Sequence, residues 1–477
     1  MSINSFEKFK EKVSEIANKL KEAIKRDESF LIINHNDADG LASAGILCGT
    51  FYREDARFTI RTIQSFSDFI NDYNEKYVDA DNIIFVDIGS GYLDEIENIL
   101  PNKKESIFIL DHHQIVGKKE LNHLNPHLFG IDGAIDISAS GIAYFVSKEI
   151  NKENVIYSPI AIVGALGDLQ DKNGKRILKG LNSLIVKEAV ENGLLSVNED
   201  LIFYGRSYKP IHVALSNTTS PYIPGLSGRE ENCVSFLSSL GIKLKENDKW
   251  KVLSELEEEE KKKIYNGIVM YLTERKVSTK IASELIGEVY ELIKEEEWTY
   301  LRDAREFSSL LNACGKFGQP WIGILIAMGV RGSILEEAHK ILEEYRLQIA
   351  KSMEYVLRPG VIEEMNNIVI LRGNEIIDEK QISSIASIIS SSSLIPIDKP
   401  LIAIAFTKEK SKISARANRE LVDKGLNLGE ILSNLSKKFD GRGGGHAIAA
   451  GAEIPLIKLN NFLIELDKEI GKIIEKK

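Results

Sequence analysis

The chain has 477 residues, about three times the usual size of one domain, so we expect two or three domains with substantial cores. Hydrophobic residues make up 43% and charged residues 28%, which is typical of a soluble globular protein, and no apolar run approaches the roughly 18 residues of a membrane span. The net charge of −10 argues against a protein that coats nucleic acid, because such binding depends on neutralising phosphates.

The sequence also predicts a cellular location and a redox state. The first thirty residues show no signal-peptide pattern, so we expect a cytoplasmic protein. The three cysteines, Cys48, Cys233 and Cys314, lie far apart and form no CxxC spacing, which argues against a disulfide framework and against a zinc knuckle. We therefore expect ordinary reduced thiols.

Charge is distributed unevenly along the chain. Residues 346–477 contain 20 Lys and Arg against 17 Asp and Glu, so this segment is slightly basic and the preceding part carries the acidic excess. An anionic ligand is therefore expected to bind the C-terminal part, while the acidic groups upstream are available for a cation, with a metal as the obvious candidate.

The first 190 residues predict a parallel α/β domain. An amphipathic helix is expected over 6–24, followed by short apolar strands at about 30–34, 58–63, 83–88 and 106–110 with helical stretches between them. Short buried strands that alternate with helices indicate a largely parallel sheet. In such sheets the functional residues gather beyond the carboxyl ends of the strands.

The rest of the chain predicts two further parts. Charged helices dominate after about residue 190, including one at 253–276, and a second α/β pattern begins near residue 360. That pattern contains the strands IVILRG, LIAIAF and KISARAN and a serine-rich helix at about 382–393. We predict an α/β protein with domains at 1–190 and 346–477, joined by a mostly helical region at 191–345.

Acidic and histidine side chains end the apolar stretches of the first domain. They are His35, Asp37 and Asp39 after LIIN, Asp87 after IIFV, Asp111, His112 and His113 after SIFIL, and Asp168 at the end of IAIVGALGD. Any one of these has an ordinary explanation as a helix cap or a satisfied strand end. Four such sites, one at the end of each apolar stretch, are expected to converge on one edge of a sheet, and together they predict a functional site.

Crowded carboxylates with one or two imidazoles suit a pair of divalent metal ions. Like charges raise one another's pKa and repel, and cations between them remove that cost. The mixed donor set favours manganese, with magnesium as the alternative. Two ions about 3.5–4 Å apart can activate a shared water and stabilise charge at phosphorus, so we expect a phosphoester or phosphoanhydride substrate.

These residues carry a resemblance to the DHH phosphoesterase superfamily. Its four motifs are matched, in order and at similar spacing, by HNDADG at 35–40, VDIGSG at 86–91, DHHQ at 111–114 and GALGD at 164–168. The resemblance implies two bound ions that share Asp87. The implied ligands are Asp37 and Asp87 for one ion and Asp39, Asp87, His112 and Asp168 for the other.

The resemblance also implies roles for three neighbouring side chains. Asp111 is expected to orient the histidines, and His113 is expected to face the scissile phosphate. Some members of the superfamily carry the first-motif histidine four residues before the first aspartate, whereas His35 lies two residues before Asp37. Two roles for His35 therefore remain open, a ligand of the first metal and a hydrogen bond to the substrate.

The C-terminal part resembles the substrate domain that accompanies the DHH domain in this superfamily. The matching stretches are ISARAN at 413–418 and GRGGGHAIAAGA at 441–452. Neighbouring glycines let backbone amides approach a phosphate or a base, and arginine and histidine supply further donors. The substrate-binding residues expected here are Arg416, Gly441, Arg442, Gly443, Gly444, Gly445 and His446.

The middle region extends the resemblance to archaeal RecJ-type exonucleases over nearly the whole chain. It contains YGRSYKP at 204–210, SPYIPGLSG at 220–228 and LRDAREFSSLLNACGKFGQPWIG at 301–323. Within the last stretch, Arg302, Arg305, Asn312 and Lys316 fit an ordinary helix surface. The alternative is that Asn312 and nearby basic groups line a nucleic-acid channel beside the metals.

The function implied by this resemblance is a manganese-dependent phosphodiesterase, an exonuclease that releases mononucleotides from an end of single-stranded DNA or RNA. One alternative is a nano-RNase or dinucleotide phosphodiesterase that acts on very short substrates. The other is a replisome scaffold without chemistry, against which the intact motifs argue. Polarity and the choice between DNA and RNA stay open. The expected partners are short or long single strands and replication or repair proteins, with no membrane, and the protein is a monomer or a homodimer.

Overall fold

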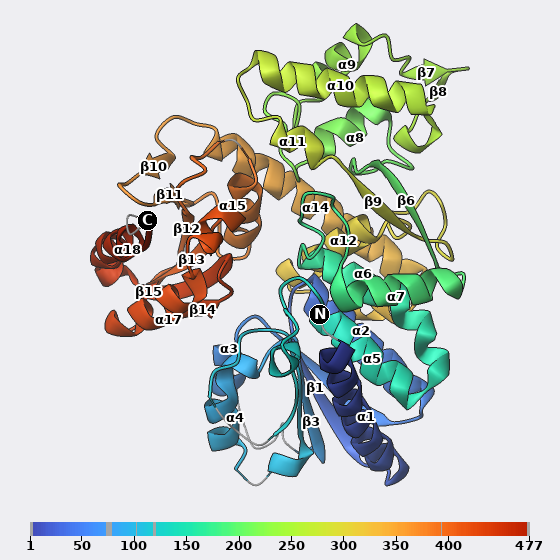
Figure 1. Cartoon of the computed structure of the whole chain (residues 1–477), viewed down its shortest axis with the longest axis vertical. Helices are drawn as coiled ribbons and strands as arrows, with labels where there is room; N and C mark the ends of the chain where they lie inside the picture. The colour runs from blue at the N-terminus through green and yellow to red at the C-terminus, as the bar shows by residue number, and fades with distance from the viewer. Residues whose placement is uncertain (1–2, 73–78, 102, 118–120, 393, 475–477) are drawn as a thin grey trace. The chain divides into compact units, whose positions relative to one another are not determined.

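The computed structural model shows a chain that forms two compact units. It describes residues 3–72, 79–101, 103–117, 121–392 and 394–474. The first unit consists of residues 1–200 and 287–343, and the second of residues 201–286 and 344–477. A parallel sheet near the N-terminus, many helices after it and a mixed sheet near the C-terminus confirm the predicted α/β class (Figure 1).

A five-stranded parallel sheet forms the centre of the first unit, in the order β2-β1-β3-β4-β5. The strands are β1 Ser29–His35, β2 Arg57–Ile63, β3 Asn82–Val86, β4 Ile107–Leu110 and β5 Asn122–Leu124. The sequence predicts the first four, and β5 is too short to show a periodicity of its own. Every residue of β3 and β4 is buried, as expected for strands covered on both faces.

Helices cover both faces of this sheet, because alternate side chains of each strand point to opposite sides. Leu31 and Ile33 pack in a core with α3 and α4, whereas Phe30 stacks on Phe51 of α2 with ring centroids 4.6 Å apart. The helices of this part are α1 Ile3–Lys25, α2 Ala38–Arg53, α3 Phe66–Asp72, α4 Leu93–Ile99, α5 Ala139–Ile150, α6 Ser158–Gly167 and α7 Gly180–Glu191.

The first unit is completed by a segment that returns from far along the chain. Strand β9, Ile286–Leu292, pairs with β6, Leu195–Leu201. It is followed by α12 Ala304–Lys316, α13 Pro320–Ala327 and the start of α14 Ser333–Val356. Helix α12 packs on α2 and α6, and α13 packs along α2. The first unit therefore needs two separate stretches of sequence.

The middle part of the chain forms a helical core in the second unit. Its elements are α8 Ile211–Asn217, α9 Glu230–Ser239, β7 Lys245–Glu246, β8 Lys249–Trp250, α10 Glu258–Glu274 and α11 Lys280–Ser283. The core is apolar, with Ile264, Ile268 and Leu272 of α10 fully buried against residues of α8 and α9. The charged side chains at the start of α10 lie largely on its outer face, as the sequence indicates.

A six-stranded mixed sheet organises the C-terminal part, in the order β10-β11-β12-β13-β15-β14. Its strands are β10 Ile362–Glu364, β11 Val369–Arg372, β12 Leu401–Phe406, β13 Lys410–Arg416, β14 Arg442–Gly445 and β15 Ala449–Pro455. Its helices are α15 Ile382–Ser390, α16 Arg419–Asp423, α17 Leu428–Lys438 and α18 Leu459–Ile474. One face packs on α17 and α18 and the other on α15, so β12 and β13 lie between helical layers (Figure 1).

Candidate metal centre

The carboxyl ends of three neighbouring strands bring predicted site residues together. The sheet register places Asn34, Val86 and Leu110 side by side. The residues that follow them are His35, Asp87 and Asp111. The strand order 2-1-3-4-5 changes direction between β1 and β3, and ligands of open α/β sheets bind at such a switch point.

Asp168 reaches the same place from a helix and not from the sheet. The apolar stretch before it forms α6, and Asp168 is the residue at which that helix ends. The expectation that all four motifs lie on one sheet edge is therefore wrong for the fourth. Residues 158–166 are all buried, so the stretch has no polar periodicity that would separate a buried helix from a buried strand.

The first motif places two carboxylates at the start of α2. Asp37 is the N-cap of this helix and accepts a hydrogen bond of 3.0 Å from the backbone N–H of Gly40. Asp39 lies in the first turn and is fully buried, where it accepts bonds of 2.7 Å and 3.0 Å from the amides of Ala139 and Ser140 at the start of α5. A Cβ at Gly40 would lie 2.3 Å from a backbone oxygen, so only glycine lets the helix begin here.

One group of potential ligand atoms comes from His35, Asp37 and Asp87. Their ligand atoms lie within 4.8 Å of one another. The Nδ1 atom of His35 is 2.8 Å from Oδ2 of Asp37 and 3.6 Å from Oδ2 of Asp87. Asp87 has a left-handed backbone with φ of 60°, an unusual conformation for an aspartate that is typical of functional sites.

A second group comes from Asp39, His112 and Asp168, again within 4.8 Å of one another. The Nε2 atom of His112 is 3.1 Å from Oδ2 of Asp168, 3.4 Å from Oδ1 of Asp87 and 3.9 Å from Oδ2 of Asp39. Asp87 therefore lies between the two groups, with one carboxylate oxygen directed toward each.

The second histidine and the aspartate of the third motif are held by hydrogen bonds. Asp111 is fully buried and accepts bonds from the amides of Ser90, His112 and His113 and from Nδ1 of His113 at 2.7 Å. The Nδ1 atom of His112 lies 2.6 Å from the carbonyl oxygen of Gly133, which directs Nε2 toward the carboxylates. Both carboxylate oxygens of Asp111 therefore accept hydrogen bonds that orient the third motif and the ring of His113.

The pKa values report an excess of negative charge. Burial, together with the charges of Asp168 and Asp87, raises the pKa of Asp39 well above its ordinary value. Burial and the charge of Asp37 also raise the pKa of Asp87. For His35 burial acts in the opposite direction, but the Asp37 carboxylate outweighs it and raises the pKa to about 10. Positive charge placed among these groups would reverse the shifts of the carboxyls.

The residues fit a pair of divalent cations. Asp87 has a 1% exposed side chain, and neither of its carboxylate oxygens accepts a hydrogen bond of normal geometry from the described residues. Buried polar atoms are normally paired, so acceptors that are left over point to a cation as their partner. Carboxylate oxygens mixed with imidazole nitrogens are donors that Mn²⁺ and Mg²⁺ accept.

Gly164 provides a test of how tightly Asp39 is held. A Cβ at this position would lie 2.4 Å from Oδ1 of Asp39 and 2.2 Å from Oγ of Ser140. We expect Gly164→Ala to lower the free energy of unfolding by about 1–3 kcal/mol and to weaken Mn²⁺ binding, because Asp39 must move. Urea unfolding and calorimetric titration measure both effects. Gly174→Ala is the control, since nothing lies within 4 Å of its added Cβ. If both variants were equally stable, Gly164 would not be packed closely against Asp39.

Several groups that support the site have no signature in the sequence. The amides that bind Asp39 and the carbonyl that orients His112 belong to the backbone, so residue types do not reveal them. Ser138 is the exception, because it caps α5 in the pattern expected of a helix start. Asn125 also contributes, donating to the carbonyl of His113 at 2.9 Å and to Ser90 at 2.8 Å.

Helix α12 supplies Asn312 to the first motif. The side-chain oxygen of Asn312 accepts a hydrogen bond of 2.9 Å from the backbone N–H of Ala38, so it holds the start of α2. Arg305 does not lie on a solvated helix surface, since it binds Asp171 at 2.7 Å and its side chain is 16% exposed. Arg302 donates to the backbone carbonyls of residues 292 and 295.

Arg416 ends β13 and extends over α15. Its guanidinium donates to the hydroxyls of Ser383 at 2.8 Å, Ser387 at 3.1 Å and Ser414 at 3.0 Å. Among the described residues no carboxylate pairs with it, and burial lowers its pKa to about 10. A partly buried cation surrounded by hydroxyls is an environment that suits an anionic ligand.

The glycine run lies on β14, where most of its members have a packing reason. Helix α17 crosses this strand so closely that a Cβ at Gly443 would lie 2.8 Å from the backbone oxygen of Leu432. Just before the strand, a Cβ at Gly441 would lie 2.3 Å from the backbone oxygen of Glu453 on β15. Gly445 has φ of 132°, which favours glycine. A Cβ at Gly444 would meet nothing within 4 Å, so packing does not require a glycine there.

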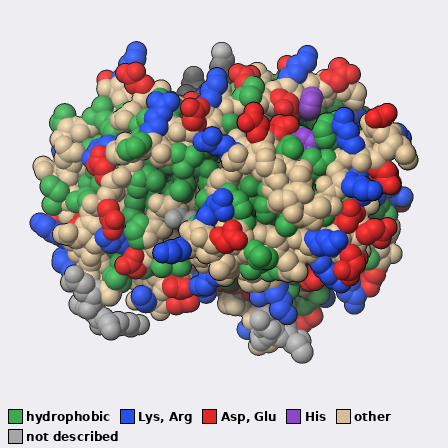
Figure 2. All heavy atoms as spheres, turned by 90° about the horizontal axis from the view of Figure 1, so that it is seen from above, with side chains coloured by type: hydrophobic (Ala, Val, Ile, Leu, Met, Phe, Trp, Pro, Cys, Tyr) green, Lys and Arg blue, Asp and Glu red, His purple; other side chains and the backbone are tan. Residues whose placement is uncertain are grey.

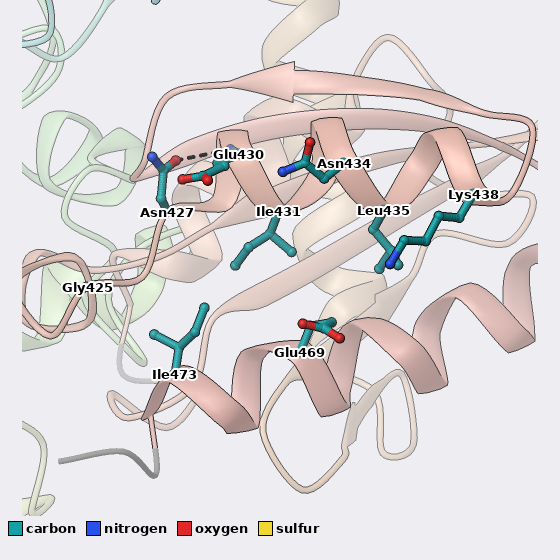
Figure 3. Close-up of a pocket in the computed structure, with 9 residues that line it drawn as sticks. All are labelled: Gly425, Asn427, Glu430, Ile431, Asn434, Leu435, Lys438, Glu469 and Ile473. Atoms are coloured by element: carbon teal, nitrogen blue, oxygen red, sulfur yellow. Dashed lines mark hydrogen bonds between the residues drawn. The ribbon is translucent and has the colours of Figure 1, made fainter.

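Arg442 and His446 flank these glycines. Arg442 is exposed at the start of β14, and His446 lies in the turn to β15, where its amide donates to the carbonyl of Ala449 at 2.8 Å. A pocket of about 200 Å³ lies elsewhere in this part, between α17 and α18 (Figure 3). Its lining includes Glu430, Lys438 and Glu469 and none of the predicted substrate-binding residues.

Three protein-family profiles match the chain. The profile described as DHH family, N-terminal domain, matches residues 29–167, the DHH-CID domain matches 203–286 and the DHHA1 domain matches 365–472. The uncharacterized protein MJ0831 of Methanocaldococcus jannaschii is 33% identical over 474 residues, which cover 98% of this chain and 99% of that protein. Within the described residues, no helix combines the length and apolarity needed to cross a membrane.

Two solved structures share the fold over 97% of this chain, each at 15% identity. RecJ from Thermus thermophilus in complex with Mn²⁺ aligns with a TM-score of 0.59 over 55% of its own length, so the chain spans about half of that protein. CDC45 from Entamoeba histolytica aligns with a TM-score of 0.65 over 99% of its length. These likenesses show the fold.

Proposed function

The chain belongs to the DHH family, whose members are typically metal-dependent phosphoesterases and nucleases, and from this we propose that it is a Mn²⁺-dependent phosphodiesterase. We propose further that it releases mononucleotides from an end of single-stranded DNA or RNA. The observation that carries the proposal is the position of Asp87, which belongs to the first ligand group and lies 3.4 Å from His112 of the second. Its buried oxygens accept no hydrogen bond of normal geometry from the described residues.

We assign His35, Asp37 and Asp87 to one ion and Asp39, Asp87, His112 and Asp168 to the other. Of the two roles open for His35, ligand is favoured because its Nδ1 atom lies in the first group, 2.8 Å from the Asp37 carboxylate. Bound there, two divalent cations would supply an activated water and neutralise charge at phosphorus. Mn²⁺ is proposed because both oxygen and nitrogen donors are present, with Mg²⁺ as the alternative.

His113 is the residue we assign to the scissile phosphate. Its Nδ1 atom is held by Asp111 at 2.7 Å, so the ring is fixed in orientation and Nε2 faces away from Asp111. The side chain is 36% exposed, unlike that of His112 at 1%. A partly exposed imidazole ring whose orientation is fixed by a buried carboxylate is suited to a hydrogen bond with a phosphate oxygen.

The C-terminal domain is proposed to hold the nucleotide chain, through Arg416, the glycines 441 and 443–445, Arg442 and His446, with Asn312 as a contact near the metals. Support comes from the partly buried guanidinium of Arg416 among serine hydroxyls and from the open space at Gly444. Figure 2 shows basic and acidic side chains interspersed on one face of the molecule.

Digestion of end-labelled strands tests the proposal. We expect purified protein with Mn²⁺ to shorten single-stranded DNA or RNA to mononucleotides and to do nothing in EDTA. Labels at the 5′ and the 3′ end, followed separately on gels, show which end is attacked. Intact strands of both kinds in the presence of Mn²⁺ and of Mg²⁺ would contradict an exonuclease.

The same assay separates the two alternative functions. Turnover of dinucleotides that exceeds turnover of strands of about twenty nucleotides would favour a phosphodiesterase for short substrates, because only an extended binding surface gains from length. Failure to cleave either, in a protein that still binds Mn²⁺, would favour a scaffold without chemistry.

A further inference from the structure

The end of α12 touches the loop that carries the first acidic motif. A Cβ at Gly315 would lie 1.7 Å from the carbonyl oxygen of Asn36, so the helix backbone rests directly on that loop. Three residues earlier, Asn312 binds the amide of Ala38. Whatever follows Gly315 in the chain therefore begins beside the metal centre.

A tight turn connects α12 to α13. Gly318 has φ of 71°, its amide donates to the carbonyl of Gly315 at 3.2 Å, and the amide of Gln319 donates to the carbonyl of Cys314 at 2.9 Å. A left-handed glycine with these bonds is a helix C-cap of fixed shape. Pro320 then starts α13 immediately, so the turn leaves the next residues little freedom.

The direction of α13 places its first turn at the end of α2 that holds the carboxylates. A Cβ added at Gly323 of α13 would lie 3.0 Å from Leu41 of α2, and one added at Gly45 of α2 would lie 2.4 Å from Ala327 of α13. The contacts advance in the same order along both helices, so α13 and α2 run side by side in the same direction. Because α2 begins at the metal centre, the first turn of α13 lies at that end. Helical side chains also lean toward the N-terminus, which directs Trp321 further that way.

Trp321 presents its indole ring to solvent in a fixed position. The residue is 47% exposed, and its Nε1–H donates to the side-chain oxygen of Gln319 at 2.7 Å. Residues 312–321 include Lys316 and no acidic side chain. An exposed aromatic ring that is held by a hydrogen bond, in a stretch of sequence without acidic side chains, has the properties of a base-stacking platform.

We infer that Trp321 stacks on a nucleobase of the strand whose phosphodiester lies at the metal centre. The class of ligand rests on the proposed function, and the ring position rests on the contacts of α12 and α13. Every nucleobase has a flat face, so such a contact holds a strand near the metals without reading its sequence. Phosphate contacts alone would leave the terminal nucleotide free to rotate.

A matched residue in the same unit serves as the control. Trp298 is 74% exposed, more than Trp321, but it follows Glu295, Glu296 and Glu297 in the chain. An anionic strand is repelled from such an acidic loop. Trp298 should therefore contribute nothing to binding, although it offers more ring surface.

Binding of labelled single strands in EDTA, measured by fluorescence anisotropy, tests the inference without any catalysis. We expect Trp321→Ala to weaken binding about 5-fold to 100-fold, Trp321→Phe to retain most of the affinity, and Trp298→Ala to match the wild type. On an oligomer of abasic sites, Trp321→Ala should bind as the wild type does. Affinity within about twofold of the wild type on natural strands would overturn the inference.

A second measurement does not depend on the alanine variant folding. The chain has three tryptophans, so changing Trp250 and Trp298 to Phe leaves Trp321 as the sole tryptophan fluorophore. Its emission should be quenched by added strand and not by the abasic oligomer, and an unchanged signal under saturating strand would overturn the stacking. Cleavage of strands with Mn²⁺ alongside that negative result would leave the proposed phosphodiesterase intact, whereas quenching without cleavage would leave the stacking site intact.

Discussion

Replacing Asp87 by Asn is expected to lower the rate of hydrolysis by about 10³-fold or more while raising the melting temperature of the metal-free protein. Loss of a shared ligand removes several kcal/mol of charge stabilisation, and each 1.4 kcal/mol is about tenfold in rate. The gain in stability has a separate cause. Burial and the charge of Asp37 raise the pKa of Asp87, so its ionised form destabilises the fold at neutral pH.

Hydrolysis of end-labelled strands measures the loss of rate, and thermal unfolding with and without Mn²⁺ measures the change in stability. Mn²⁺ should raise the melting temperature of the wild type, since it binds the folded state, and should raise that of Asp87→Asn far less. Asp55→Asn removes an exposed aspartate in a turn and should behave as the wild type. The Asp39→Ala variant should also lose hydrolytic activity toward single strands. A full Mn²⁺ response in the Asp87 variant would rule out the shared-ligand assignment.

Arg305→Met is expected to destabilise the protein by about 3 kcal/mol or more. Asp171 is 1% exposed and depends on Arg305, which binds it through two nitrogens at 2.7 Å and 3.2 Å, and on Arg176 at 3.4 Å. Removing Arg305 leaves a buried carboxylate with one weaker partner. Because Asp171 follows Asp168 by three residues, the change should also loosen the fourth motif and weaken Mn²⁺ binding.

The double variant Asp171→Asn, Arg305→Met separates loss of a partner from loss of packing. Replacing both charges avoids the isolated carboxylate, so we expect it to recover much of the stability lost in the single variant. Arg26→Met, at an exposed arginine whose side chain is 58% accessible, should change the free energy of unfolding by less than about 0.5 kcal/mol in urea titrations. A single variant as stable as the wild type would show that the ion pair contributes little.

The sequence predicts the acidic cluster well because parallel strands end on the same side of a sheet. His35, Asp87 and Asp111 each follow a short apolar run, and the observed register aligns those runs without gaps. Asp168 is harder to place, since a helix buried all round and a buried strand have the same apolar composition. An aspartate at the end of an apolar stretch predicts a site residue, although the sequence does not show whether that stretch is a helix or a strand.

The sequence says much less about what supports the cluster. Asn312 and Arg305 act on the first and fourth motifs from a helix more than 130 residues away in sequence, and no local pattern records such a pairing. The sequence also does not predict which serines bind Arg416. The serine-rich stretch predicts a helix, but only the tertiary structure shows that Ser383 and Ser387 accept hydrogen bonds from the guanidinium. Non-local hydrogen bonds of this kind depend on packing and not on composition.

The two-part construction of the first unit has a consequence for how the protein is made. All four acidic motifs leave the ribosome early, but α12, whose Asn312 holds the start of α2, is synthesised only after residues 201–286. At about 5–20 residues per second that interval lasts on the order of ten seconds. The nascent chain therefore contains the carboxylates before it contains the helix whose Asn312 holds them in place. The candidate metal centre can be completed only after α12 has been synthesised.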